Sequence, residues 1–416
     1  MQGAKISTLL VFQTAYTYQE MVDRNLTIFF TSKDLGGYFS RVITVHPISD
    51  YSKLLEKQID YGKTKFIRHN EIHTFIEGRV ARYSFLKNLK TLNFLLAQIN
   101  LFFAIRNHAK ESKIDFIRAE DPRLNGLWGI IFKRVIGVPL FVGNWGNPQT
   151  IRNLTQKPLM PRFFKKIWVE TFIEKKVFKV ADCALAQNAD NLQFILDYGI
   201  NLEKTAIFRL GNAINPCHFE NPGQRARVEI PQIESLAPST RILLCAFALE
   251  RRKILEDAFE VINLLKGEFK ITLVVAGDGS ARSHYAKLCE DMNLKNNIVF
   301  LGNISQESLS YLMMRADVIL SPLTGRALAE SVLSSTPVVA YDIDCHPELI
   351  ESGVTGELVP FRDWNQMAEK TRKLLLDEEY AKRIGITGRQ KALSFMDPET
   401  IRKTQVTIFQ KYARLQ

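Results

Sequence analysis

The chain has 416 residues, and at roughly 100–200 residues per domain this length predicts two or three domains. Hydrophobic residues make up 46% and charged residues 24%, which excludes a disordered chain and a fibrous repeat. The five cysteines are scattered and form no C-x-x-C pair, which excludes a disulfide framework and a cysteine zinc site and suits a reducing cytoplasm. The formal charge of +11 points to an anionic partner, namely a nucleic acid, a membrane surface or a phosphorylated substrate.

The first ten residues show neither the hydrophobic region nor the cleavage site of a signal peptide. A transmembrane helix needs about 20 apolar residues, whereas the stretch 92–105 is shorter and is interrupted by Asn93, Gln98 and Asn100. We therefore expect a cytoplasmic protein that does not span a membrane.

The first half of the chain alternates short apolar strands with longer helical stretches. The expected strands are 7–12, 41–46, 114–119 and 139–144. Because these strands are apolar at nearly every position, they are typical of a parallel sheet that is covered on both faces.

A polar stretch then interrupts the alternation. Four of the 15 prolines lie within residues 216–238, which we interpret as a linker. After it, strands are expected at 241–247, 271–277, 298–302, 318–322 and 337–342, with helices at about 251–266, 281–293, 305–315 and 327–335. Strand–helix repeats of this kind predict a second open parallel sheet. A last helix is expected after the Asp397-Pro398 pair.

The clearest candidate for a ligand site is the turn Ser321–Arg326 between a strand and a helix. A helix N-terminus offers free N–H groups and partial positive charge to a phosphate, and Arg326 adds a fixed cation. Glu330, one turn further on, could accept hydrogen bonds from ribose hydroxyls. A plain strand–turn–helix with a solvated Glu330 explains the pattern equally well.

Two further patterns follow strands of the second half. Gly277 and Gly279 would let the backbone approach a ligand closely, although a tight turn is the simpler interpretation. Arg251, Arg252 and Lys253 would open a helix and oppose its dipole, which suggests a bound diphosphate. Taken by itself, the run is more simply interpreted as a solvated surface cluster.

In the first half, the loop Arg118–Pro122 follows a strand and carries two adjacent acids. Glu120 is the candidate for orienting an acceptor hydroxyl or acting as a base. For Asp121 we favour capping of the next helix, with Pro122 at the first helical position.

Several other chemistries find no support. The Asp342-Ile343-Asp344 match to a metal-binding D-x-D motif is short and common by chance. The chain has no P-loop and no nucleic-acid-reading motif, so we expect neither a metal nor a nucleic acid as a partner.

Taken in order, the motifs of the second half resemble those of the family 4 retaining glycosyltransferases. They are RLGNAIN (209–215), VVAGDGS, NIVFLGNIS, ADVILSP, GRALAESVLSSTPVVAYD and PELIESGVTGELVP. The resemblance runs from Arg209 to about Gln410, and the first half matches the family mainly in layout. It implies the GT-B fold, in which two Rossmann-like α/β domains face each other across a cleft. The expected domains are 1–215 on the acceptor side, a linker at 216–238, a nucleotide-sugar domain at 239–396 and a helix at 397–416 that crosses back.

The resemblance also implies roles for particular residues. Glu330 would bind the donor ribose and Arg251 would approximate the family's phosphate-binding lysine. The remaining donor-site residues would be Asn212, Gly277, Gly279, Gly302, Asn303, Ile304, Thr324, Gly325, Arg326 and Ala327, with Gly302 to Ile304 lining the base pocket. The sequence departs from the family where Pro322 replaces the first motif glutamate and Ala246 lies near the position of the motif arginine. Arg252, Lys253 or Arg326 could replace the missing positive charge.

The expected activity is that of a hexosyltransferase that keeps the anomeric configuration. A sugar would pass from a uridine or guanosine diphosphate donor to a hydroxyl of a glycan or lipid-linked acceptor, in the synthesis of a cell-surface polysaccharide or lipopolysaccharide. Cations and a helix N-terminus would stabilise the departing diphosphate, without a metal ion or other cofactor. The alternatives are a scaffold protein that binds the sugar nucleotide without turnover, suggested by Pro322 and Ala246, and a GT-B nucleotide-sugar epimerase.

Over half of the net charge lies in one segment. Between Arg152 and Lys179 there are eight basic and two acidic residues, a net charge of +6. Within it, 161–180 mixes lysines with Trp168 and four phenylalanines, which suits an interfacial helix and peripheral membrane contact at the inner face of the cytoplasmic membrane. A core-facing helix with a solvated basic edge has equal weight.

Overall fold

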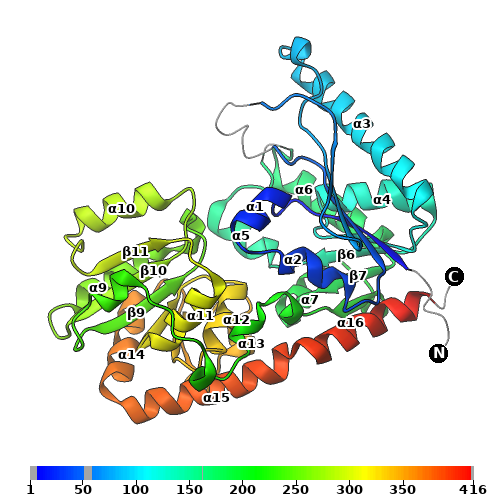
Figure 1. The fold of residues 1–416 in the computed structure, drawn as a ribbon. Coiled ribbons are helices and arrows are strands. Elements are labelled where there is room, and N and C mark those ends of the chain that lie inside the picture. Colours follow the sequence, from blue (N-terminus) through cyan, green and yellow to red (C-terminus); the bar gives the residue numbers. More distant parts are fainter. Residues whose placement is uncertain (1–6, 51–58, 162, 414–416) are drawn as a thin grey trace. The chain divides into compact units, whose positions relative to one another are not determined.

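The structure is a computed structural model that describes residues 7–50, 59–161 and 163–413 (Figure 1). The chain folds into two compact units. The first comprises Met1–Arg209 together with Glu399–Gln416, and the second comprises Leu210–Pro398. Both are α/β units built on largely parallel sheets, as the alternation of apolar strands and helical stretches predicts.

Within the described residues, the first unit holds an eight-stranded sheet in the order β3-β4-β2-β1-β5-β6-β7-β8. Neighbouring strands are parallel, apart from the antiparallel pair β3–β4. The four expected strands are present as β1, β2, β5 and β6, and β3, β4, β7 and β8 extend the sheet beyond them. The bounds are β1 (Thr8–Phe12), β2 (Arg41–His46), β3 (Lys65–Arg68), β4 (His73–Glu77), β5 (Phe116–Ala119), β6 (Leu140–Asn144), β7 (Cys183–Ala186) and β8 (Thr205–Ile207).

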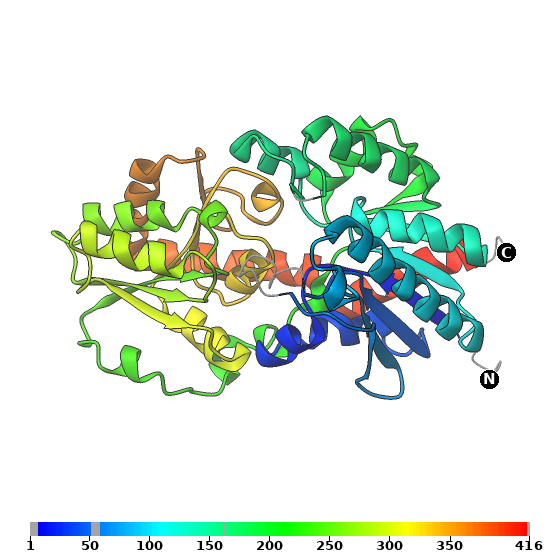
Figure 2. The ribbon, with the colours of Figure 1, turned by 90° about the horizontal axis from the view of Figure 1, so that it is seen from above.

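Helices cover both faces of this sheet. On one face α3 and α4 run side by side, with the rings of Phe102 and Phe132 centred 5.4 Å apart (Figure 2). On the other face lies α16, whose Phe409 packs 4.6 Å from the ring of Phe141 (Figure 1). The helix α16 begins at Pro398, as the sequence predicts. The helices of this unit are α1 (Tyr18–Asp23), α2 (Ile28–Thr31), α3 (Lys90–Glu111), α4 (Leu124–Ile136), α5 (Pro148–Thr155), α6 (Ile167–Val180), α7 (Ala189–Asp197) and α16 (Pro398–Ala413).

The second unit holds a six-stranded parallel sheet in the order β11-β10-β9-β12-β13-β14. Its strands are β9 (Arg241–Ala246), β10 (Ile271–Ala276), β11 (Ile298–Gly302), β12 (Val318–Ser321), β13 (Val338–Tyr341) and β14 (Glu357–Val359). The first five lie where the sequence predicts strands. The helices are α8 (Pro231–Glu234), α9 (Leu255–Leu265), α10 (Arg282–Asp291), α11 (Gln306–Arg315), α12 (Arg326–Val332), α13 (His346–Leu349), α14 (Trp364–Leu376) and α15 (Glu378–Met396).

The stretch 216–238 differs from the expected linker because it packs within the second unit. Ile230 and Ile233 are buried in the core of that unit. The buried guanidinium of Arg225 donates hydrogen bonds to the carbonyl oxygens of Ser310 and Leu333. The prolines begin short helical turns, at Pro216–His218, Pro222–Gln224 and Pro231–Glu234, instead of marking an extended connection. The first unit accordingly ends at Arg209, six residues before the expected boundary at 215.

Among the helices formed by the described residues, none combines the length and the apolar character needed to cross a bilayer. All five cysteines lie in the described part of the chain, and all are unpaired thiols.

Candidate functional site

Each sheet has a point where the strand order reverses, and in open α/β sheets ligands bind outside the carboxyl ends of the strands at such a point. In the second sheet it falls between β9 and β12, since β10 and β11 continue in one direction from β9 while β13 and β14 continue in the other from β12. The loop 247–253 therefore lies beside the turn 322–325. These are the two loops that carry most of the expected phosphate-binding residues.

The turn after β12 leads directly into α12, which begins at Arg326 with Gly325 as its N-cap. Gly325 provides no side chain to cap the helix, and its carbonyl oxygen accepts a hydrogen bond from the N–H of Leu328. The hydroxyls of Ser321 and Thr324 lie 2.6 Å apart and fix the start of the turn. Thr324 is buried, whereas Gly325 is exposed.

His346, which the sequence analysis did not single out, holds this turn in place. Its Nε2 lies 3.0 Å from the carbonyl oxygen of Thr324, and its Nδ1 lies 2.8 Å from that of Tyr341. Burial lowers the pKa of His346, although both carbonyl oxygens act in the opposite direction. The ring is therefore neutral at pH 7 and donates a hydrogen bond to one of the two carbonyls at a time. His346 thus links β13 to the phosphate-binding candidate.

Glu330 and Arg326 form an ion pair one helical turn apart, with Nε 3.0 Å from Oε1. The Glu330 side chain is only 4% exposed and that of Arg326 26%, so the structure does not support a solvated Glu330. His218 faces the same pair. Burial lowers the pKa of His218 most strongly, and the negative charge of Glu330 partly offsets that effect. The Nε2 of His218 lies 3.1 Å from Oε1 of Gln306. Neither His218 nor Gln306 was predicted, because their proximity to Glu330 arises only in the fold.

The basic run 251–253 occupies a separate 3-10 turn before α9. Ile254 follows it in the left-handed region with φ of 57°, and α9 begins at Leu255 with Glu256 and Asp257 in its first turn. The expectation that three cations oppose the dipole of this helix is therefore wrong. Arg251 is exposed, and Lys253 lies close enough to His346 for its positive charge to lower the pKa of that ring. Arg252 belongs to the same turn.

Local backbone structure explains why glycine occupies positions 277, 279 and 302 of the second unit. A Cβ on Gly277 would clash with the carbonyl oxygen of Phe247, and one on Gly279 would clash with that of Leu249. The chain itself therefore occupies the space that these glycines leave free, which favours the tight-turn interpretation. Gly302 needs a positive φ of 70°, and its carbonyl oxygen accepts a hydrogen bond from the Gly277 N–H.

The other expected donor-site residues lie in several loops and turns of the second unit. Asn303 is exposed and Ile304 packs against the hydrophobic core. Ala327 is half-buried in the first turn of α12, and Asn212 is half-buried in the turn Gly211–Ala213. Pro322 and Ala246, the two departures from the family pattern, are both buried.

Glu120 lies at the reversal of the first sheet, between the carboxyl ends of β1 and β5. Its carboxylate contacts Lys33 at 3.3 Å and Arg118 at 3.1 Å. Burial alone would raise the pKa of Glu120, but the two cations outweigh it and hold the pKa below its ordinary value. A carboxylate with a lowered pKa is a weak base, so this environment suits Glu120 for hydrogen bonding to a substrate better than for removing a proton.

Asp121 does not cap the next helix as expected. Its Oδ1 accepts a hydrogen bond from the N–H of Arg123, only two residues on, and α4 begins later at Leu124. This Asx turn shapes the loop. Burial raises the pKa of Asp121 despite the neighbouring Arg123. Elsewhere in the described chain, no three His, Cys, Asp or Glu side chains gather closely enough to hold a metal ion.

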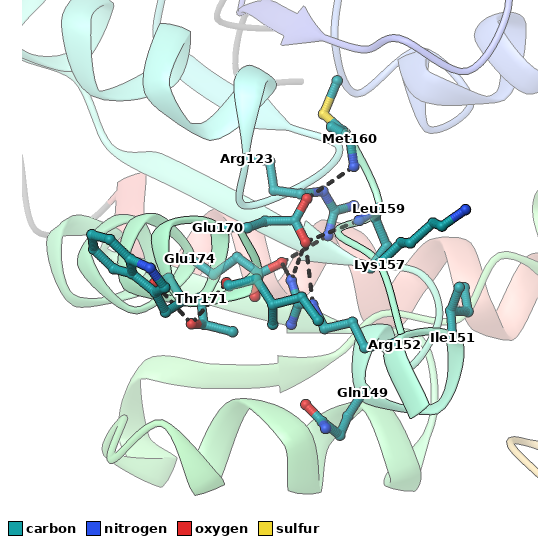
Figure 3. A network of polar contacts seen from close by, with 12 residues as sticks. Arg123, Gln149, Ile151, Arg152, Lys157, Leu159, Met160, Glu170, Thr171 and Glu174 are labelled. Atoms are coloured by element: carbon teal, nitrogen blue, oxygen red, sulfur yellow. Dashed lines mark hydrogen bonds and ion pairs between the residues drawn. The ribbon is translucent and has the colours of Figure 1, made fainter. Parts of the chain in front are cut away.

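A buried ionic network ties this loop to α5 and α6 (Figure 3). The guanidinium of Arg152 contacts Glu170 at 2.6 Å and Glu174 at 2.7 Å, and all three side chains are at most 1% exposed. Glu174 also pairs with Arg123 at 2.9 Å. Glu170 accepts further hydrogen bonds from the N–H groups of Leu159 and Met160.

The network has a consequence for the surface charge of the basic segment. Both acidic residues between Arg152 and Lys179 point inward, so within the described residues the segment exposes no carboxylate. Trp168 and Phe172 are 66% and 60% exposed, and the five lysines of residues 161–180 accompany them at the surface: Lys165, Lys166, Lys175, Lys176 and Lys179. Arg162, which the sequence analysis counted with these, lies outside the described residues.

Comparison with solved structures defines the fold class. The sucrose-phosphate synthase of Thermosynechococcus elongatus superimposes with a TM-score of 0.75 at 16% identity, covering 99% of this chain and 100% of that one. HepE of Anabaena, in complex with UDP, superimposes with a TM-score of 0.68 at 16% identity over 98% and 100% of the two chains. The protein therefore has the GT-B fold.

Residues 227–391 match the family described as "Glycosyl transferases group 1". A poly(ribitol-phosphate) alpha-N-acetylglucosaminyltransferase of Staphylococcus aureus (strain COL) is 24% identical over 255 residues, which are 58% of this chain and 48% of that one. The chain spans about half the length of the curated relatives it matches. The family match lies entirely within the second unit.

Proposed function

We propose that this protein is a retaining glycosyltransferase that moves a sugar from a nucleoside-diphosphate donor to a hydroxyl of a glycan or lipid-linked acceptor. The observation that carries the proposal is the arrangement at the reversal of the second sheet. There, a turn into α12, the Arg326–Glu330 pair and the basic run 251–253 meet at the carboxyl ends of β9 and β12. The family match covers this whole region, and HepE, which shares the fold, binds UDP.

The proposed donor site separates ribose recognition from phosphate recognition. The diphosphate lies on the N–H groups of residues 325–327, where the partial charge of α12 and the guanidinium of Arg326 favour an anion. Arg326 then exchanges part of its contact with Glu330 for the phosphate, which frees a carboxylate oxygen of Glu330 for a ribose hydroxyl. Arg251 and Lys253 add positive charge on the other side of the point where the strand order reverses. They replace the family's motif arginine, whose position lies near Ala246 in this chain.

Departure of the diphosphate is the step that these groups assist. The bond between the anomeric carbon and the phosphate oxygen breaks, and negative charge grows on the leaving group. Fixed cations and oriented N–H groups stabilise that charge without reorganising. The cations of this site supply the charge that a metal ion would supply elsewhere, so we propose transfer without a metal or another cofactor.

We propose that the acceptor binds to the first unit, at the reversal of its sheet. Glu120 stays ionised between Lys33 and Arg118 and accepts a hydrogen bond from the acceptor hydroxyl. This role orients the nucleophile, whereas the lowered pKa makes Glu120 unsuited to removing its proton. The acceptor proton passes to the leaving phosphate.

We further propose that α6 and the residues before it contact an anionic membrane surface. Among the described residues of 161–180, five exposed lysines, two exposed aromatic side chains and no exposed acid distinguish this segment from an ordinary solvated helix edge. Such contact would place the protein at the inner face of the cytoplasmic membrane, where lipid-linked acceptors for cell-surface polysaccharide synthesis are found.

A thermal-shift screen of nucleoside-diphosphate sugars tests the donor site. At a ligand concentration of about 100 times Kd, binding stabilises the protein by about 2.7 kcal/mol, and Glu330→Ala should remove that gain. The nucleotide that binds is then supplied with membrane extract, and NMR of the product reports whether the anomeric configuration is kept. Failure of every nucleotide to stabilise the wild type contradicts the site, and stabilisation without transfer or hydrolysis favours the scaffold alternative.

Flotation with liposomes that contain phosphatidylglycerol tests membrane contact. Replacing four surface lysines by glutamate, at Lys165, Lys166, Lys175 and Lys176, should abolish co-flotation. A matched variant carries four exposed lysine-to-glutamate changes in the second unit, at Lys266, Lys270, Lys287 and Lys382, and should still float. Equal flotation of both variants contradicts the membrane role of the segment.

A further inference from the structure

A cavity of about 370 Å³ opens in the first unit beside the amino-terminal end of α3. Its walls are mainly apolar and include Ile59, Tyr61, Val80, Ala81, Phe94 and Phe163. This volume is within the range of about 300–1,000 Å³ that is usual for small-molecule sites. The residues that line the cavity are distant in sequence from Glu120 and from every donor-site candidate. None of them has a role in the transfer proposed above.

Asn93, a buried polar residue of the cavity lining, already has hydrogen-bond partners. The Oδ1 of Asn93 accepts hydrogen bonds from the N–H groups of Arg82 at 2.7 Å and Tyr83 at 2.8 Å. The Nδ2 of Asn93 donates to the carbonyl oxygen of Tyr83 at 2.6 Å. Asn93 therefore needs no hydrogen bond from a ligand, and the cavity interior suits a hydrocarbon better than a sugar.

The charges around the cavity favour an anion at its mouth. Lys87 and Lys90 line the cavity and are exposed. The nearest acid in sequence to the wall, Asp60, is paired with Arg79 at 3.4 Å. An apolar interior under two exposed lysines matches a molecule that has a hydrocarbon chain and a phosphate at one end.

The outer face of α3 continues this apolar surface away from the cavity. Leu92, Leu95, Ile99 and Phe103 recur every three or four residues, and each is 46–52% exposed. The opposite, buried face of the helix carries Asn93, Ala97, Leu101 and Ile105, so α3 is apolar on both sides. The row of exposed side chains begins near the cavity, where Phe94 approaches Phe163 of the basic segment with ring centres 6.0 Å apart.

We propose that the cavity binds the hydrocarbon chain of an anionic lipid acceptor, with the lipid phosphate on Lys87 and Lys90. The inference rests on the proposed transfer and specifies its acceptor as a lipid phosphate or diphosphate. Membrane contact through α6 brings the protein to the bilayer, and the cavity extracts part of one chain from it. The acceptor hydroxyl is then the part that extends from the cavity mouth.

Titration of the full chain with monoalkyl phosphates, followed by calorimetry, tests the cavity without a membrane. Burying a methylene contributes about 0.8 kcal/mol, or about fourfold in affinity, so octyl phosphate should bind about 15-fold more tightly than hexyl phosphate. The double variant Lys87→Gln/Lys90→Gln should weaken octyl phosphate at least tenfold. Octyl glucoside, which has the chain but no anion, should bind as weakly to the wild type as octyl phosphate binds to the double variant.

Thr91→Trp places a large ring at the cavity lining from an exposed position of α3, so the variant should fold and lose octyl phosphate binding. The matched control Asn107→Trp lies on the same helix, is also at an exposed position and should bind octyl phosphate as the wild type does. Equal affinity for both chain lengths, or unchanged binding by Thr91→Trp, overturns the inference. The inference is also overturned if the wild type is a dimer and Thr91→Trp is a monomer, because a second copy of the chain would then occupy the cavity.

Nucleotide binding separates failure of this inference from failure of the proposed function. Thr91→Trp should keep the thermal stabilisation by the donor nucleotide, because the donor site lies in the second unit. If nucleotide binds but alkyl phosphate does not, the transferase proposal stands and the lipid cavity is wrong. If alkyl phosphate binds but no nucleotide does, the lipid site stands without the transfer.

Discussion

Replacing Arg152 by methionine should destabilise the first unit by about 3–5 kcal/mol, because removing one partner of a buried ion pair leaves the other charge without compensation. Arg152 is 1% exposed, and its Nη2 reaches Glu170 at 2.6 Å and Glu174 at 2.7 Å. Methionine keeps most of the aliphatic volume, so the loss reports the charge rather than a cavity. This cost is a large fraction of the stability of a typical domain.

The two glutamates should contribute unequally to that cost. Glu174 keeps Arg123 at 2.9 Å and the hydroxyl of Tyr198 at 2.8 Å. Glu170 keeps two backbone N–H donors but has no other ion pair in the described structure. The Arg152→Met change should therefore cost about 2 kcal/mol less in a Glu170→Gln background, where the remaining carboxylate of Glu174 keeps its contacts with Arg123 and Tyr198. In a Glu174→Gln background, the reduction in the cost of Arg152→Met should be smaller.

Urea unfolding followed by tryptophan fluorescence measures these free energies. A Trp364→Phe background removes the one tryptophan of the second unit, so that Trp128, Trp145 and Trp168 report on the first unit alone. The exposed pair Arg227 and Glu234, 3.4 Å apart, provides a matched control, and Arg227→Met should cost less than about 1 kcal/mol. The reasoning would be refuted if Arg152→Met lowered the free energy of unfolding by less than about 1 kcal/mol. It would also be refuted if the cost of Arg152→Met fell by the same amount in the two glutamine backgrounds.

Four other outcomes follow from particular contacts. Burial lowers the pKa of His46 from 6.5 to about 4, so the folded state favours the neutral ring and the free energy of unfolding falls by about 2 kcal/mol between pH 7.5 and pH 5. In His46→Gln the free energy of unfolding should depend less on pH over this range. His346→Phe should raise the donor KM about tenfold with a smaller change in kcat, because the turn at Thr324 loses its hydrogen bond. Arg326→Gln should raise the donor KM about 10- to 100-fold through loss of a charge-assisted contact, and an unchanged KM would contradict the phosphate assignment. Transfer should continue undiminished in EDTA, and loss of activity that Mg²⁺ or Mn²⁺ restores would show that the cations do not suffice.

The sequence predicts the strands that are buried on both faces. An apolar run such as Ile271–Ala276 has no polar side to present to water, so it identifies a parallel strand directly. The edge strand Lys65–Arg68 has the opposite character, with three of its four residues exposed, and its sequence resembles a loop. Strands of this kind depend on pairing with a neighbour that is not visible locally.

Residues 216–238 show the limit of composition as evidence for a linker. Prolines and polar residues are also the residues that begin short helical turns, and Ile230 and Ile233, at the start of α8 and within it, are buried in the core of the second unit. The contacts of Arg225 with distant carbonyl oxygens also show that the stretch is part of the unit, and neither feature is visible in the local composition.

The candidate site was predictable where it rests on local pattern, as in the turn before Arg326 and Glu330. His346 and His218 were not, since a lone histidine in a loop gives no sign of which carbonyl or carboxylate it will face. The acids at positions 170 and 174 were counted against the charge of a surface segment, although both are buried with Arg152. Knowing which face a helix buries therefore changed the interpretation of its charge.

The account depends most on a diphosphate bound at the start of α12, and the amide of Gly325 reports on it directly. Selective labelling of the 22 glycines with ¹⁵N gives a spectrum in which Gly325→Ala, a change that meets no atom within 4 Å, identifies its resonance. Titration with UDP and GDP should shift that resonance strongly and saturably while distant glycines such as Gly137 stay in place. A nucleotide that binds without moving the Gly325 resonance, or a spectrum that neither nucleotide changes, would contradict the account.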